Sequence, residues 1–176
     1  RKKSVAPIEA ALAEHRALRA DLNLLASVQV FLPREITDAP RHKSLCFHPS
    51  LLPRFRGGAA LQYQIILGER EAGVSVFVPD GGVDTGPIVW QKGGVEISPT
   101  ETTSTLFFEK LQPLGIDAMV EATELVASGR AKPLEQDERL ATAHGLVDDT
   151  VAAIDLAAPA AEIDRLVRGC DPQPGA

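Results

Sequence analysis

The sequence contains few residues of several types, and each shortage argues against a class of protein. It has two cysteines, Cys46 and Cys170, which stand far apart and outside any CxxC pattern, so neither a disulfide framework nor a cysteine zinc site is indicated. No apolar run approaches the roughly 20 residues that a membrane span needs. The net charge of −6 argues against a broad surface for nucleic acid or anionic lipid. We therefore expect a reduced, cytoplasmic protein without a membrane partner.

The segments that are present indicate a globular protein that mixes strands and helices. With 44% hydrophobic and 24% charged residues, the 176-residue chain can form one domain with a substantial core. Short apolar runs typical of buried strands alternate with helical patterns, which predicts an α/β fold with a mostly parallel sheet. The connection "DGGVDTG" is too short for a parallel crossover, so it predicts one antiparallel hairpin. The expected strands are 21–33, 44–48, 73–79 and 87–97. The expected helices are 5–18, 58–69, 102–128 and 160–169, with a short helix or turn at 33–40.

Three helix signals concern the second half of the chain. Ser98-Pro99-Thr100-Glu101 has the form of a capping box with proline in the first turn, ahead of the helix at 102–128. Pro113 and Gly115 should break or kink that helix. Gly169 should end the last helix.

Three polar residues in two segments are candidates for chemistry in such a fold. His48 ends the strand "SLCFH" on the same face as Cys46, and open α/β sheets bind ligands beyond the carboxyl ends of parallel strands. The alternative is a histidine that only caps nearby backbone. Asp80 and Asp84 surround Gly82 in the turn "PDGGVDTGPI", which by itself is typical of a hairpin turn. Spacing alone leaves both interpretations open.

Two separated motifs, "HPSLLPRFRG" at 48–57 and "GVDTG" at 82–86, resemble the folate-dependent formyltransferase family in order and distance. The resemblance extends from about residue 20 to 175. It implies a Rossmann-like domain that uses 10-formyltetrahydrofolate as formyl donor and needs no metal. The expected fold is then a Rossmann-like, mostly parallel α/β sheet with an antiparallel hairpin. This sheet would lack its first strands, since the chain starts at Arg1 and its first expected element is the helix at 5–18.

The resemblance assigns roles to particular residues. His48 matches the catalytic histidine and can donate a hydrogen bond to the oxyanion that forms when the formyl carbon is attacked. Asp84 matches the catalytic aspartate and can orient the imidazole and accept a proton from the nucleophile. Folate contacts are implied for two segments, whose members are Ser27, Val28, Gln29, Val30, Phe31 and Leu32 in the first and Asp80, Gly81, Gly82 and Val83 in the second.

Cys46 departs from the transferase pattern, because the family asparagine falls at this position. A thiol is a weaker donor than an amide. The chain is similar in this respect to the hydrolase domain of 10-formyltetrahydrofolate dehydrogenase, which favours water as the acceptor. A carrier thiol and methionyl-tRNA stay open as acceptors, as does a non-catalytic folate-binding remnant. Cys46 itself is either a small inert core residue, which we favour, or a nucleophile that receives the formyl group.

Two further expectations concern basic residues and domain organisation. Arg54 and Arg56 are candidate contacts for a folate glutamate tail or a substrate phosphate, and the alternative is a solvated basic loop. We expect residues 1–150 to form an N-terminally truncated formyltransferase-type catalytic domain, and residues 151–176 to begin a linker or C-terminal subdomain.

Overall fold

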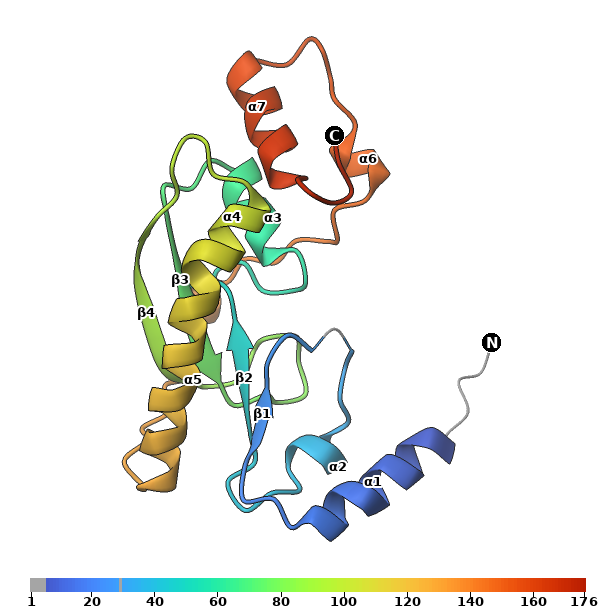
Figure 1. Cartoon of the computed structure of the whole chain (residues 1–176), viewed down its shortest axis with the longest axis vertical. Coiled ribbons are helices and arrows are strands. Elements are labelled where there is room, and N and C mark those ends of the chain that lie inside the picture. Colours follow the sequence, from blue (N-terminus) through green and yellow to red (C-terminus); the bar gives the residue numbers. More distant parts are fainter. Residues whose placement is uncertain (1–5, 29) are drawn as a thin grey trace.

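The computed structural model describes residues 6–28 and 30–176 and confirms the α/β class (Figure 1). The strands are β1 (Asn23–Leu25), β2 (Ser44–His48), β3 (Glu71–Phe77) and β4 (Ile88–Glu96). The α-helices are α1 (Ala6–Leu18), α2 (Arg34–Thr37), α3 (Ala60–Ile66), α4 (Thr103–Thr105), α5 (Gln112–Ala127), α6 (Asp149–Ala152) and α7 (Ala160–Gly169). A π-helical segment, η1 (Leu106–Leu111), precedes α5, and a 3₁₀ turn, η2 (Glu138–Leu140), follows it.

The four strands form one mixed sheet in the order β1-β2-β3-β4. β1 runs parallel to β2, with Leu25 opposite Cys46. β2 and β3 are antiparallel, with His48 opposite Ser75, and β3 and β4 form the expected antiparallel hairpin. The parallel part is therefore a single pair of strands within 6–28 and 30–176, a smaller share than expected. The reason is that β3 enters the sheet at the end where β2 leaves it.

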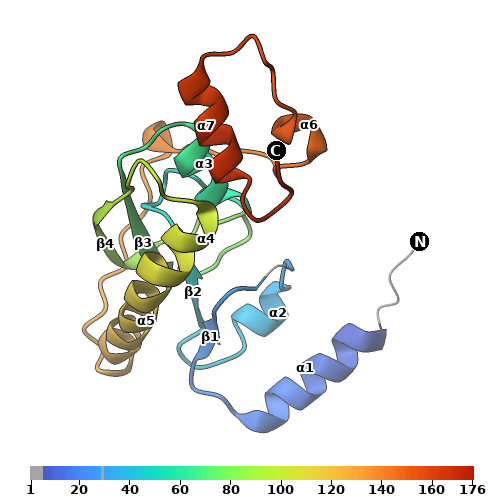
Figure 2. The same cartoon turned by 45° about the horizontal axis from the view of Figure 1, so that its top comes forward.

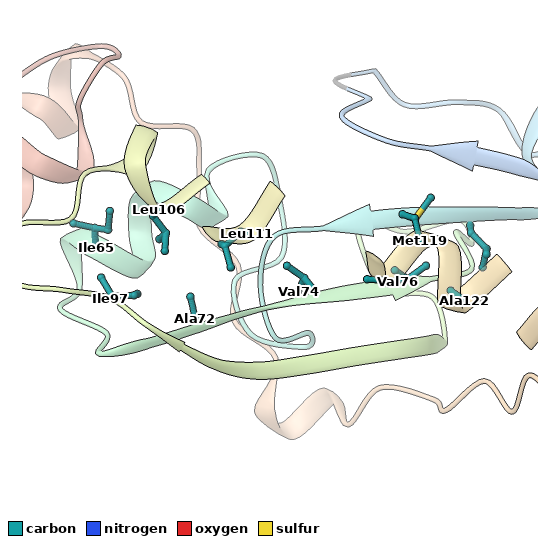
Figure 3. Packing of buried hydrophobic residues seen from close by; sticks show 11 residues of the cluster. Ile65, Ala72, Val74, Val76, Ile97, Leu106, Leu111, Met119 and Ala122 are labelled. Atoms are coloured by element: carbon teal, nitrogen blue, oxygen red, sulfur yellow. The ribbon is translucent and has the colours of Figure 1, made fainter. Parts of the chain in front are cut away.

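One face of the sheet packs against the long helical region (Figure 3). Alternation along β3 sends Ala72, Val74 and Val76 to this face, where Val74 and Val76 are fully buried. The helical region contributes apolar side chains that are nearly all inaccessible to solvent, namely Leu106, Leu111, Ala118, Met119 and Ala122. Phe47 points to the same face, so Cys46 and His48 point to the opposite one.

The helical region between 102 and 128 changes type instead of breaking at Pro113. The amide of Gln112 bonds to the carbonyl of Phe107, five residues back, and the chain then continues as α5. A π turn fits just before Pro113, because proline has no backbone N–H to donate to a helical hydrogen bond. Gly115 does not break the helix either, and a Cβ placed there would lie 2.4 Å from the ring of Phe47, so glycine permits close packing on β2.

The C-terminal part of the chain packs on α3 through α7, as Figures 1 and 2 both show. Gly169 ends α7 as expected, and its carbonyl accepts a 2.7 Å hydrogen bond from the hydroxyl of Thr103. Within the described part of the chain, the helices are too short or too polar to cross a membrane.

Candidate functional site

β2 carries His48 to the end of the sheet, where the loop 49–58 begins. This loop is fixed to β3, because the Ser75 hydroxyl donates to the carbonyl of Ser50 at 2.6 Å and accepts from the amide of Leu52 at 3.1 Å. The Ser50 hydroxyl donates to the carbonyl of Arg54 at 2.7 Å. Ser50 therefore shapes the loop, and His48 has a rigid surrounding.

The imidazole of His48 meets two acceptors. Its Nε2 lies 2.7 Å from the carbonyl oxygen of Phe55, and a carbonyl can only accept, so Nε2 carries a proton. Its Nδ1 lies 3.4 Å from Oδ2 of Asp84, which is longer than an ordinary hydrogen bond. The side chains of His48 and Asp84 are 7% and 20% exposed, so the pair is mostly enclosed but opens to solvent on the side of Asp84. Two residues 36 positions apart in the sequence thus meet at one end of β2.

Asp84 is held in the β3–β4 turn by its backbone and its carboxylate. Its φ of 54° lies in the left-handed region, which is uncommon for a residue with a side chain. Its Oδ2 accepts a 2.7 Å hydrogen bond from the amide of Gly57, in the loop after His48. The carboxylate therefore contacts the imidazole and that loop together.

Asp80 has a different task in the same turn. Its Oδ1 accepts from the amide of Gly82 at 2.8 Å and from the hydroxyl of Thr85 at 2.6 Å. Burial raises the pKa of Asp80, but these hydrogen bonds outweigh burial and lower it overall. Asp80 is thus an ionised residue that shapes the turn.

Cys46 lies on the same strand face as His48. Burial raises the pKa of its thiol to about 12, and the negative charge of Asp84 adds to the rise. Its Sγ is 3.7 Å from the carbonyl of Phe47. The thiol is therefore neutral at physiological pH.

The segment expected to hold folate leaves the sheet at the same edge as His48, because β1 and β2 are parallel. Among the described residues of the apolar run 21–33, three form a strand. After it, Val28, Val30 and Phe31 expose 43%, 66% and 66% of their surface. In the turn of Asp84, Val83 is 59% exposed. Gln29, also expected to contact folate, lies outside the described residues.

An apolar cavity of about 490 Å³ lies on the opposite face of the sheet, between β1, β2 and α5. It is lined by Phe47 and Gly115, and among the residues expected to contact folate it includes Ser27. His48 and Asp84 do not line it. The cavity is therefore distinct from the histidine–aspartate site.

The two arginines expected to bind anions differ in their contacts. Arg54 is half exposed, pairs with Glu69, and lies 5.0 Å from the ring centre of Phe55. The Arg56 side chain is only 8% exposed, and its guanidinium bonds to Glu138 and Gln136. Arg56 is thus occupied by internal partners, and its expected role as an anion contact stays a prediction.

Sequence reasoning missed Gln136 and Thr142. Gln136 donates to the carbonyls of Asp84 and Gly86 at 2.8 and 2.7 Å. Thr142 accepts from the amide of Phe55 at 2.8 Å through its hydroxyl. Both lie in a segment without helical or strand periodicity, so no pattern in the sequence indicated a contact with the site.

The fold and the site define a class of protein: an α/β domain with a histidine and an aspartate paired at the end of a strand. A family model described as "Formyl transferase" matches residues 2–123, and the chain belongs to this family. It is 44% identical to human cytosolic 10-formyltetrahydrofolate dehydrogenase over 94% of this chain and 18% of that protein. It is 41% identical to methionyl-tRNA formyltransferase of Stutzerimonas stutzeri (strain A1501), over 94% of this chain and 52% of that protein.

Solved structures share the fold. The crystal structure of HypX from Aquifex aeolicus in complex with tetrahydrofolic acid matches with a TM-score of 0.82 at 23% identity, over 94% of this chain and 28% of that one. WlaRD, a sugar 3N-formyl transferase, matches with a TM-score of 0.73 at 21% identity, over 88% of this chain and 56% of that one. The chain spans about a fifth of the dehydrogenases and about half of the tRNA enzyme that it matches.

Proposed function

We propose that this chain is the catalytic domain of a one-carbon enzyme that takes the formyl group from 10-formyltetrahydrofolate and passes it to water. Membership of the formyl transferase family supports a formyl-group reaction. The observation that carries the proposal is the approach of His48 Nδ1 to Asp84 Oδ2, at 3.4 Å, beside a carboxylate that keeps access to solvent.

The proposed step uses the two groups in different roles. A water oxygen forms a bond to the formyl carbon, its proton passes to Asp84, and the carbonyl electron pair moves onto the formyl oxygen. Nε2 of His48 is held by Phe55, so Nδ1 is the nitrogen that meets this oxygen. The role requires a proton on Nδ1, from which the ring donates to the oxyanion beside Asp84, which now holds the proton from water. Collapse then breaks the bond between the formyl carbon and N10, and N10 takes the proton that Asp84 received from water. Tetrahydrofolate and formic acid leave, and the acid ionises to formate in solution.

Two observations favour water over another acceptor. The neutral thiol at Cys46 replaces an amide that would bind the oxyanion in the transferase pattern. The first relatives carry the name 10-formyltetrahydrofolate dehydrogenase. The match to a methionyl-tRNA formyltransferase supports the second candidate, formylation of methionyl-tRNA.

The test measures formate release from 10-formyltetrahydrofolate by the intact protein. We expect His48→Asn and Asp84→Asn each to lower kcat by about 100-fold or more, while calorimetry shows folate binding within a few-fold of the original. His42→Asn, in the turn before β2, and Asp117→Asn, exposed on α5, are the matched controls and should leave kcat unchanged. Folate binding without formate release would contradict the hydrolase proposal. Formylation of methionyl-tRNA in a parallel assay would support the second candidate, and inactivity in both would leave a folate-binding remnant.

A further inference from the structure

We propose that the segment 134–143, here called the strap, positions the histidine–aspartate pair, and that Gln136 is its main positioning residue. This inference rests on the proposed function, because it concerns the same two groups. The strap follows α5 after the connection 128–133 and runs back past β4 before the chain reaches α6 (Figure 2). It pairs with Ile88 at one end, where Leu134 and Ile88 exchange two backbone hydrogen bonds of 2.8 Å, and it bridges to Arg56 through Ala143 at the other.

The side-chain amide of Gln136 uses its whole hydrogen-bonding capacity on the two loops of the site. Its Nε2 donates to the carbonyls of Asp84 and Gly86 at 2.8 and 2.7 Å. Its Oε1 accepts from Nε and Nη2 of Arg56 at 3.1 and 2.8 Å. Gln136 therefore ties the turn that carries Asp84 to the loop that follows His48.

Arg56 is itself held by the strap. Its Nη1 and Nη2 donate to the Glu138 carboxylate at 2.9 and 2.6 Å, a paired geometry that fixes the guanidinium plane. The hydrogen bond with Glu138 raises the pKa of Arg56, so the pair stays ionised. The backbone amide of Arg56 also donates to the carbonyl of Thr142 at 2.8 Å.

The residues that the strap fixes are the ones that contact the pair. Phe55 offers its carbonyl to His48 Nε2, and its amide is bonded to Thr142. Gly57 donates its amide to the Asp84 carboxylate. Both Phe55 and Asp84 have φ in the left-handed region, at 58° and 54°, and such conformations persist only where surrounding contacts hold them. The strap supplies those contacts to both residues.

The variant Gln136→Met tests the role, because methionine keeps the length of the side chain and removes every hydrogen bond. We expect kcat to fall about 10- to 100-fold, the range for a small misplacement of reacting groups, with the Kd for tetrahydrofolate within about twofold of the original. Glu135→Met is the matched control, since Glu135 is exposed on the same strap, and kcat should not change. Rescue by Gln136→Glu is not expected, because a carboxylate would face two carbonyls without a donor.

A double-mutant cycle separates positioning from general destabilisation. In the Asp84→Asn background, Gln136→Met should lower residual kcat by no more than about threefold, because the group that it positions is already disabled. An equal loss in both backgrounds would overturn the inference.

A readout independent of turnover distinguishes failure of this inference from failure of the proposed function. Long-range ¹H–¹⁵N spectra report the two ring nitrogens of each histidine, and Gln136→Met should shift the His48 signals while those of His42 stay in place. If the unmodified protein releases formate and Gln136→Met changes neither kcat nor the His48 signals, the strap inference fails and the proposed function stands. If the unmodified protein is inactive, the proposed function fails, and unchanged His48 signals would also overturn the strap inference.

Discussion

At the scale of single residues, the informative position is Cys46. By the resemblance to the formyltransferase family it is expected at the place of an asparagine, and it lies on the face of β2 that carries His48. Desolvation and the charge of Asp84 both act against the thiolate, and together they raise the pKa to about 12 from an ordinary 9.0. A nucleophilic cysteine needs the opposite environment, with positive charge or donors that stabilise the thiolate. The inert interpretation is therefore favoured over the covalent one.

Thiol reactivity tests this environment. The variant Cys170→Ala leaves Cys46 as the single thiol. We expect iodoacetamide at pH 8 to alkylate it more slowly than a small reference thiol, by a factor on the order of 1,000. The reason is that the thiolate fraction falls tenfold for each unit by which the pKa is raised. The rate should rise as pH increases toward 12. Asp84→Asn should speed the reaction, because it removes a negative charge that opposes ionisation. Reactivity equal to the reference thiol would contradict the assignment, and loss of turnover in Cys46→Ala would reopen the covalent route.

The residue scale also shows what could be read from the sequence. His48 could be proposed from the sequence because strand alternation and a motif both point to it. Asp84 could be proposed because its motif follows the first one at the distance found in the family. The internal partners of Arg56 and the contacts of Gln136 could not be predicted, for one shared reason. Arg56 and Gln136 bond to each other across 80 positions of the sequence. The strap has no helical or strand periodicity, so only the folded structure shows that the two residues meet.

At the scale of elements, the start of the long helical region differs from the expected capping box at Ser98–Glu101. The structure forms the box one turn later, where the Thr102 hydroxyl accepts from the amide of Thr105 and the Thr105 hydroxyl accepts from that of Thr102. Glu101 instead pairs with Lys110 and accepts a 2.6 Å hydrogen bond from Thr105. Local spacing predicted a helix start in this region, but Glu101 is engaged by Lys110 and Thr105, and Thr102 and Thr105 form the cap.

That ion pair makes a testable contribution to stability. Burial raises the pKa of Glu101, but the hydrogen bonds from Lys110 and Thr105 outweigh burial and lower it overall. A lowered pKa in the folded state means that the stabilisation is present above the unfolded value of about 4.5 and is lost as the pH falls through the folded value.

We expect Glu101→Gln to lower the free energy of unfolding at pH 7 by about 1–3 kcal/mol, less than for a fully buried pair because Lys110 reaches solvent. Urea denaturation at pH 7 and again below pH 4 measures the difference, which should shrink at the lower pH. Glu109→Gln, exposed on the neighbouring turn, is the control and should change stability little at either pH. A difference that grows on acidification would show that folding raises the pKa of Glu101 instead of lowering it.

At the scale of the whole molecule, the order and type of most elements followed from the sequence, whereas the direction of the strands did not. The strands 44–48 and 73–79 agree closely with β2 and β3. Their antiparallel pairing depends on where α3 returns the chain, which hydrophobic periodicity does not encode. The expected separation of residues 151–176 as a linker or subdomain stays a prediction, although α7 packs on α3 and Cys170 is fully buried.

The contact between α7 and α3 depends on the absence of a side chain at Gly169. A Cβ there would lie 2.5 Å from Cγ1 of Ile66 and 3.1 Å from the carbonyl oxygen of Gln62. Alanine normally stabilises a helix relative to glycine by up to about 1 kcal/mol, so helix propensity and packing make opposite demands at this position.

We expect packing to prevail, so that Gly169→Ala destabilises the protein by about 1–3 kcal/mol through overpacking. Hydrogen exchange should become faster in α7 and in the facing residues of α3, while exchange in the central strands changes less. Gly145→Ala is the matched control, because a Cβ at Gly145 meets no atom within 4 Å. The melting temperature of this variant should be unchanged or higher. A more stable Gly169→Ala variant would mean that α7 is not held against α3 at this distance in solution. The C-terminal helix would then be a loosely attached element of the molecule, as the expectation of a separate subdomain requires.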